Sequence, residues 1–367
     1  MTTASKRPMP SEGLFNPEML VLARMAKEMT QGELADAART TQGRISKIEH
    51  GLQDPPAGLV ERCARALEYP PEFFYQRGQI HGLPLRYHRK RQSIQRKTLD
   101  RIHAEVMIRT LHIERLIRSG ALEAQTVLQI PEIDVEEYEG SIEDIARAVR
   151  AQWQLPRGPI QNLVEVLEGA GAMVVPCEFR VREVDAIGIR FPHLPPLLFV
   201  NISIPTDRLR FTLAHELGHL IMHRLPNPHM EEEANRFAAE FLMPAEDIRP
   251  QLYQVSLPVL ATLKKIWRVA MSALLVRAKT LKTITQRQYV ALWQELGRLG
   301  YRRREPAELD VEPEKPTLLR GLIQFYVSTL HYDVKEFCKA LSVLPDLFQQ
   351  WYGWLVSDNR PPLQLVG

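Results

Sequence analysis

Cysteine is scarce in this chain of 367 residues, which contains only Cys63, Cys177 and Cys338. The three are far apart, odd in number, and without the paired spacing that metal-binding cysteines have. This pattern excludes a disulfide framework and is typical of proteins from a reducing compartment.

Long apolar runs and a targeting signal are also missing. No apolar stretch reaches the roughly 20 residues that a membrane-spanning helix needs. The first residues, MTTASKRPMPSEG, lack the apolar core of a signal peptide. We therefore expect a cytoplasmic protein with no membrane partner.

Neither sign of charge is in large excess, and the net charge of +3 does not by itself indicate a nucleic-acid partner. The distribution says more, because residues 86–97 are strongly basic and residues 130–144 are acidic. The basic block either follows the phosphates of DNA or is a solvated linker. The sequence leaves both interpretations open.

Hydrophobic periodicity predicts a mainly helical chain with one mixed region. Helices are expected at residues 97–119, 142–153, 160–170, 208–223 and 231–242 and beyond residue 257, and strands at 172–176, 186–191 and 197–201. The helix at 97–119 has apolar residues near heptad spacing and a stop at Gly120. It either forms a coiled-coil dimer or packs on its own domain, which is the more ordinary arrangement.

The strongest chemical signal is the pair His215 and His219, with Glu216 between them. Residues four apart lie on one face of a helix, so both imidazoles can reach a single metal ion. Glu216 lies beside that face, where it can hold a water molecule and take its proton. Such a motif arises by chance in about one of fifty chains like this one, so its surroundings must decide.

A catalytic zinc needs a third protein ligand and one open position. The candidates are Glu231, Glu232 and Glu233, which open the next predicted helix. Glu231 shares its face with Ala234, Asn235, Ala238 and Leu242, and this largely small or apolar face should point inward. We therefore predict Glu231 as the third ligand, whereas Glu232 better fits a solvated helix N-terminus.

Two further expectations concern the neighbourhood of this motif. His223 lies another four residues along, and we expect it to interact with the carbonyls at the helix end rather than with the metal. The strand at residues 197–201 is expected to form the sheet edge beside the metal helix. An extended peptide substrate can pair with such an edge.

The runs RFTLAHELGHLIMH and EEEANRFAAEFLMP resemble the ImmA/IrrE family of metallo-endopeptidases, as do residues 152–160 and 263–269. The resemblance covers residues 142–300. It implies a zincin fold in which His215, His219 and Glu231 bind zinc and Glu216 is the catalytic base. It also implies a protein substrate, because family members cleave helix-turn-helix repressors. The chain departs from the family at Ala270, where serine is usual.

Residues 30–35 and 42–51 resemble the lambda-repressor/Cro-like helix-turn-helix, also called the XRE type. Thr30 and Glu33 form a capping box, and Leu34, Ala35, Ile45 and Ile48 supply a small core. We predict that Gln31 contacts a phosphate and that Thr41, Gln42, Arg44 and Lys47 project from the recognition helix toward a groove. The alternative is an ordinary three-helix scaffold that binds protein.

Together these patterns predict a multidomain, mainly α protein. We expect an all-α helix-turn-helix domain at residues 16–76, a basic segment and helical connector at 77–141, a zincin-like α+β domain with a small sheet at 142–250, and a helical C-terminal region of unknown role at 251–367. The predicted function is a DNA-binding regulator, expected to be a homodimer, fused to a zinc endopeptidase that cleaves a repressor or a toxin.

The alternative function is a transcription factor or antitoxin-like protein whose zinc domain senses a ligand or partner and cuts nothing. Glu216 favours the peptidase, because a purely structural zinc site needs no base. A small-molecule hydrolase is the weakest interpretation, since nothing in the sequence predicts a small polar pocket.

Overall fold

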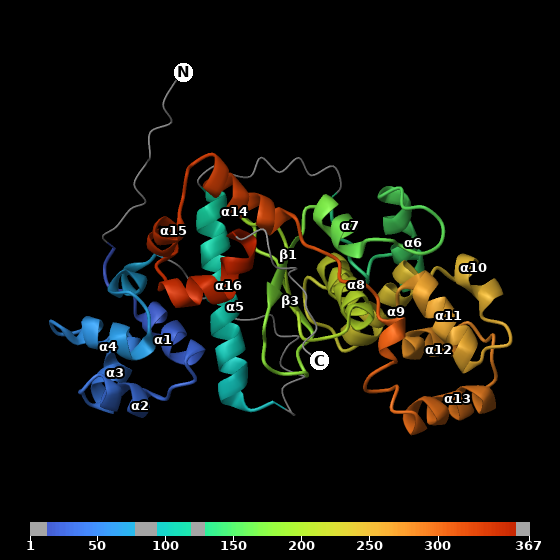
Figure 1. The fold of residues 1–367 in the computed structure, drawn as a ribbon, viewed down its shortest axis with the longest axis horizontal. Coiled ribbons are helices and arrows are strands. Elements are labelled where there is room, and N and C mark those ends of the chain that lie inside the picture. The colour runs from blue at the N-terminus through green and yellow to red at the C-terminus, as the bar shows by residue number, and fades with distance from the viewer. Residues whose placement is uncertain (1–12, 78–93, 119–128, 357–367) are drawn as a thin grey trace, which may run out of the picture. The chain divides into compact units, whose positions relative to one another are not determined.

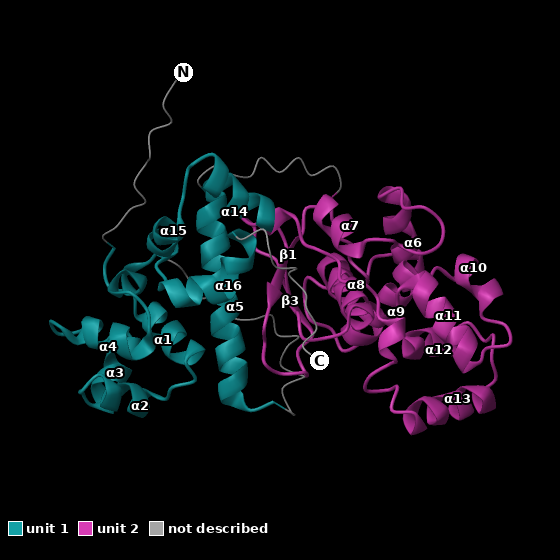
Figure 2. Ribbon diagram, viewed as in Figure 1, with its two compact units in different colours: residues 1–123, 320–361 teal, residues 124–319, 362–367 magenta. Residues whose placement is uncertain are grey.

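The computed structural model describes residues 13–77, 94–118 and 129–356. These residues are mainly helical with one small sheet, as the sequence predicts (Figure 1). The chain divides into two compact units, residues 1–123 with 320–361 and residues 124–319 with 362–367 (Figure 2). Most of the basic block at 86–97 and the helix stop predicted at Gly120 lie outside the described residues.

The first unit begins with a bundle of short helices. They are α1 (Pro17–Ala26), α2 (Gln31–Ala37), α3 (Gln42–Glu49), α4 (Leu59–Leu67) and the 3-10 helix η1 (Pro71–Tyr75). The predicted capping box at Thr30 is confirmed, since its Oγ1 accepts from the Glu33 amide at 3.1 Å and Glu33 Oε2 accepts from the Thr30 amide at 2.6 Å. The four predicted core residues of α2 and α3 are all buried.

The long helix α5 (Arg96–Leu116) belongs to the same unit, together with all but the first two residues of α14 (Leu318–Ser328) and with α15 (Val334–Leu341) and α16 (Pro345–Val356). His112 Nδ1 lies 2.9 Å from the Tyr352 hydroxyl, and the Tyr326 hydroxyl donates to the Leu116 carbonyl at 2.8 Å. Burial on several sides shows that α5 packs within its own unit, which was the more ordinary of the two arrangements expected.

The second unit contains the sheet and a larger set of helices. Its elements are α6 (Ile142–Gln152), α7 (Leu163–Gly169), β1 (Met173–Cys177), β2 (Ala186–Ile189), β3 (Leu197–Asn201), α8 (Thr206–Met222), α9 (Met230–Leu242), α10 (Ala245–Ile248), η5 (Arg249–Gln251), α11 (Leu257–Trp267), α12 (Met271–Thr280), α13 (Gln286–Arg298) and η6 (Ala307–Leu309). A single apolar core runs through α6–α13 and the sheet.

The sheet has the strand order β1-β3-β2, with β1 parallel and β2 antiparallel to β3. The prediction that residues 197–201 form the sheet edge is therefore wrong. β2 pairs with β3 from Ala186 opposite Val200 to Ile189 opposite Leu197, which places β3 in the middle. All three strands are buried along their length, so the pairing rather than the burial identifies β3 as the central strand.

Helices α8 and α9 approach each other closely at Gly218. A Cβ atom at this position would lie 3.1 Å from Cδ1 of Phe237 and 3.4 Å from the Cα atom of Ala234, both on α9. A larger side chain would push the helices apart. Glycine therefore sets the spacing between the two helices that carry the predicted metal ligands.

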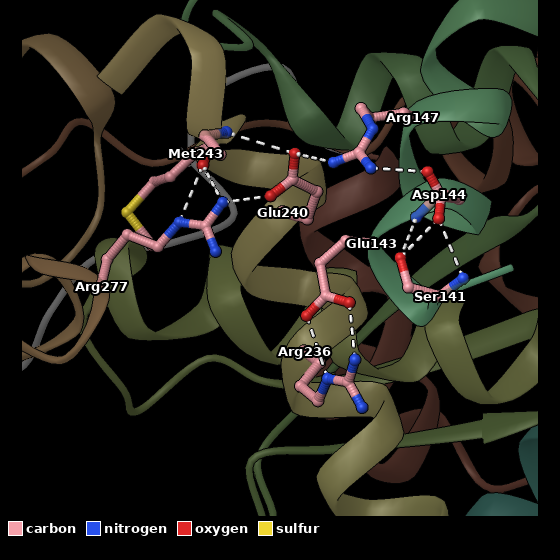
Figure 3. Close-up of polar contacts among 9 residues, drawn as sticks. Ser141, Glu143, Asp144, Arg147, Arg236, Glu240, Met243 and Arg277 are labelled. Atoms are coloured by element: carbon pink, nitrogen blue, oxygen red, sulfur yellow. Dashed lines mark hydrogen bonds and ion pairs between the residues drawn. The ribbon is translucent and has the colours of Figure 1, made fainter. Parts of the chain in front are cut away.

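Ion pairs hold α9 to its neighbours α6 and α12 (Figure 3). Glu240 of α9 is buried and pairs with the equally buried Arg277 of α12, and also with Arg147 of α6 at 2.9 Å. Nearer the solvent, Arg236 of α9 pairs with Glu143 of α6 at 2.7 Å. A carboxylate buried in this way is tolerated because two guanidinium groups compensate its charge.

We expect Glu240→Ala to lower the free energy of unfolding of this unit by about 3 kcal/mol, because it leaves the Arg277 guanidinium buried without its carboxylate. The matched control is Glu143→Ala, which removes the more exposed pair with Arg236 and should cost less than about 1 kcal/mol. Urea unfolding of both variants measures the difference. Equal losses would show that burial does not distinguish the two pairs.

Candidate metal centre

Two histidines and one glutamate converge between α8 and α9. His215 and His219 are one turn apart on α8, and their Nε2 atoms are 3.0 Å apart. Glu231, in the first turn of α9, places Oε2 3.6 Å from Nε2 of His215 and Oε1 3.4 Å from Nε2 of His219. Among the described residues, these three form the group with metal-binding geometry, their ligand atoms lying within 4.8 Å of one another.

The electrostatics of this group depend on its burial. His215 and His219 are 7% and 2% exposed, while the Glu231 side chain is 36% exposed. The imidazoles of His215 and His219 hold the pKa of Glu231 well below its usual range. Glu231 is therefore an anion facing two imidazole nitrogens, a donor set that suits a divalent cation.

Glu216 lies between the two histidines in sequence and is buried, with 3% of its surface exposed. Its Oε2 accepts a hydrogen bond from the Gly188 amide of β2 at 3.0 Å. The edge strand that residues 186–189 form thus fixes one oxygen of the carboxylate. A carboxylate held in this way keeps its orientation.

The other ring nitrogens of the two histidines also have partners. Nδ1 of His215 lies 3.0 Å from Oδ1 of Asn235 on α9. Nδ1 of His219 lies 2.9 Å from Nδ1 of His223, whose Nε2 lies 2.9 Å from Oε2 of Glu233. The expectation that His223 binds helix-end carbonyls is therefore wrong, because α9 places a carboxylate within its reach.

In the first unit, the residues predicted to contact DNA differ in exposure and in hydrogen bonding. Thr41 is the N-cap of α3, and its Oγ1 accepts from the Arg44 amide at 3.3 Å. Gln42, Arg44 and Lys47 are exposed on α3. Gln31 instead donates to Oε2 of Glu49 at 2.8 Å, so a phosphate contact by this residue remains a prediction.

Two segments of the chain match models of known protein families. Residues 168–279 match the family model of the IrrE N-terminal-like domain, peptidase family M78. Residues 20–74 match the helix-turn-helix family. The chain joins an XRE-type helix-turn-helix domain to an IrrE-like domain. No curated protein matches the chain.

The IrrE-like domain brings together the predicted trio His215, His219 and Glu231, with Glu216 on the same helix. Sequence reasoning missed the contacts that His223, Glu233 and Asn235 make with one another or with the two histidines. A signal was present, because His223 continues the four-residue spacing of the histidines.

None of the described helices has both the length and the apolar character needed to cross a bilayer.

Proposed function

We propose that this chain is a DNA-binding regulator whose IrrE-like domain is a zinc-dependent endopeptidase acting on another regulatory protein, such as a helix-turn-helix repressor or a toxin. The observation that carries the proposal is the convergence of His215, His219 and Glu231, with the buried Glu216 on the same helix as the two histidines. The match to a peptidase family favours a protein as the substrate.

Zinc fits this donor set. Zn–N distances of about 2.0–2.1 Å in tetrahedral geometry place two ligand nitrogens about 3.3 Å apart, close to the 3.0 Å between Nε2 of His215 and Nε2 of His219. Two histidines and one glutamate are a ligand set of catalytic zinc, which leaves one coordination position open. A structural zinc site is instead closed by four protein ligands.

When bound, the ion would supply Lewis acidity for the attack of water on a peptide carbonyl. Glu216 is the residue suited to accept the proton of that water and to pass it to the departing amine. The Gly188 amide orients its carboxylate, and burial keeps bulk water away from it. The side chains of His215 and His219, which would hold the ion, are buried as well.

The experiment is to incubate the zinc-loaded, full-length chain with helix-turn-helix repressors and toxins encoded near its gene. Mass spectrometry of the products identifies cleavage sites, and incubation of the chain alone reports self-cleavage. We expect cleavage that a zinc chelator stops and added zinc restores. Cleavage that persists after the metal is removed would contradict the proposal.

The DNA-binding part of the proposal rests on α3. We expect the Arg44→Ala/Lys47→Ala double variant to bind the upstream region of its own gene more weakly and with a shallower salt dependence, because two exposed cations are lost from the recognition helix. A mobility-shift titration at several salt concentrations measures both effects. We also expect a homodimer, because helix-turn-helix proteins of this type bind palindromic operators as two copies. This expectation stays a prediction.

The control for this experiment is Arg65→Ala. Arg65 is an exposed cation of the same domain, but it lies on α4 rather than on α3. Its loss should change binding less than the loss of either Arg44 or Lys47. If the double variant binds DNA as tightly as the wild type, α3 is not the recognition helix.

A further inference from the structure

A hydrogen-bonded chain of side chains extends from His219 away from the metal-binding group. Nδ1 of His219 faces Nδ1 of His223 at 2.9 Å, and Nε2 of His223 faces Oε2 of Glu233 at 2.9 Å. The amide of Asn227 donates to the same Oε2 at 3.1 Å. The His219 and His223 side chains are 1% and 0% exposed, and Glu233, at 17%, lies nearer the solvent.

The positions of the protons in this chain follow from metal binding. His219 can bind a metal through Nε2 only if that nitrogen carries no proton, so neutral His219 carries its proton on Nδ1. This proton is donated to Nδ1 of His223, which must therefore hold a lone pair. The proton of neutral His223 is then on Nε2 and is donated to the carboxylate of Glu233. Each gap contains one proton, and every donor meets an acceptor.

The same atoms do not form a second metal site. A metal ligated by His223 and Glu233 would need ligand atoms that converge on one point. His223, however, turns Nδ1 toward His219 and the opposite nitrogen, Nε2, toward Glu233. A ring that bridges its two neighbours in this way transmits orientation rather than closing a coordination sphere.

Helix α9 thus acts on both histidines of α8. It supplies Glu231 to the metal-binding group, Asn235 to Nδ1 of His215, and Glu233 to His223. Partners of this kind orient a metal-binding imidazole, select its tautomer and raise its basicity. The usual partner is a carboxylate or carbonyl in direct contact with the ligand, whereas here a histidine is inserted between His219 and the carboxylate.

We propose that His223 and Glu233 are positioning residues that hold His219 in the tautomer that binds metal through Nε2 and so set the zinc affinity of the domain. This inference rests on the proposed function only in requiring that zinc binds to His215, His219 and Glu231. It does not require cleavage. His223 touches His219 and the carboxylate behind it, and acts on the metal through His219 alone.

The first test measures the zinc dissociation constant of the full-length chain by competition with a chelator. We expect His223→Ala to weaken zinc binding about 10- to 100-fold, the usual effect of removing a partner of a metal ligand. His223→Asn should recover part of the affinity, because its side-chain oxygen can accept from Nδ1 of His219 although it cannot reach Glu233. Thermal unfolding of the metal-free proteins reports any folding defect separately.

Glu233→Ala provides the second variant, with Glu232→Ala as the matched control. The two residues are adjacent on α9, but Glu232 is exposed. Glu233→Ala should weaken zinc binding on the order of 10-fold, and Glu232→Ala should leave it unchanged. Equal affinities for the wild type, His223→Ala and Glu233→Ala would overturn the proposal, as would equal losses in the Glu233 and Glu232 variants.

Nitrogen-15 NMR of the imidazole groups in the zinc-loaded wild type tests the proton positions without any substitution. We expect the proton of His219 on Nδ1 and that of His223 on Nε2; a proton on Nδ1 of His223 would overturn the proposal. If the wild type binds no zinc, both this inference and the proposed function fail. If it binds zinc with this tautomer pattern but cleaves nothing, only the peptidase proposal fails.

Discussion

We expect the Glu216→Gln protein to bind zinc and DNA like the wild type but to cleave its target about 10²- to 10⁴-fold more slowly, the usual contribution of a general base. Glutamine keeps the shape of the side chain and its hydrogen-bond acceptor for the Gly188 amide, so the fold and the three metal-binding side chains stay in place. It cannot accept a proton from water, and this is the only property that the substitution is designed to remove.

The measurement is the rate at which the target protein disappears, together with the zinc content and the expression of the regulated gene. Glu232→Gln, an exposed residue of α9, is the control for the loss of one negative charge near the site. Regulation should fail together with cleavage. If Glu216→Gln cleaves slowly but still regulates the gene like the wild type, the peptidase is dispensable, and a zinc domain that senses a ligand or partner is the better description.

The second large effect is expected for His219→Ala. The wild type should contain about one zinc per chain, as three-ligand catalytic sites do. Removal of His219 leaves His215 and Glu231, and it also leaves His223 without the ring that its Nδ1 faces. The two remaining candidate ligands, His215 and Glu231, should not retain zinc through purification in the presence of a weak chelator.

Elemental analysis of the purified proteins measures this directly. His229→Ala is the control, because His229 is an exposed histidine immediately before α9 and near the same site. It should keep the zinc content of the wild type. Equal zinc in His219→Ala and the wild type would contradict the ligand assignment, and with it the proposed peptidase mechanism.

Local patterns predicted much of this molecule because they depend on chain geometry alone. Residues four apart share a helix face wherever the helix lies, so the proximity of His215 and His219 could be inferred before the fold was known. Glu231 could be chosen among three adjacent glutamates because its face of α9 is apolar, and the structure brings it to the histidines. The capping box of α2 was predictable for the same reason, since both of its hydrogen bonds lie within one turn.

Contacts between distant segments could not be predicted in this way. We predicted that residues 197–201 form an edge strand. In the structure β2 pairs with this strand and lies at the edge instead. We predicted that His223 contacts carbonyls at the end of its helix. In the structure its ring faces Glu233 of α9 instead. Gln31 donates from its amide to Glu49 of α3, a contact that the sequence did not indicate, while its predicted phosphate contact stays a prediction. The sequence did not predict that the C-terminal helices pack on α5. In the structure they contact it through Tyr326 and Tyr352.

The sequence by itself therefore determined the local features of this protein: its helices, their caps, and the spacing of the two candidate histidine ligands along one helix face. Only the tertiary structure decided which strand forms the sheet edge and which side chains complete the surroundings of His219. The physical reason is the range of each interaction. Periodicity specifies neighbours within a few residues, whereas a partner ten or more residues away, as Glu233 is from His223, depends on how whole helices pack.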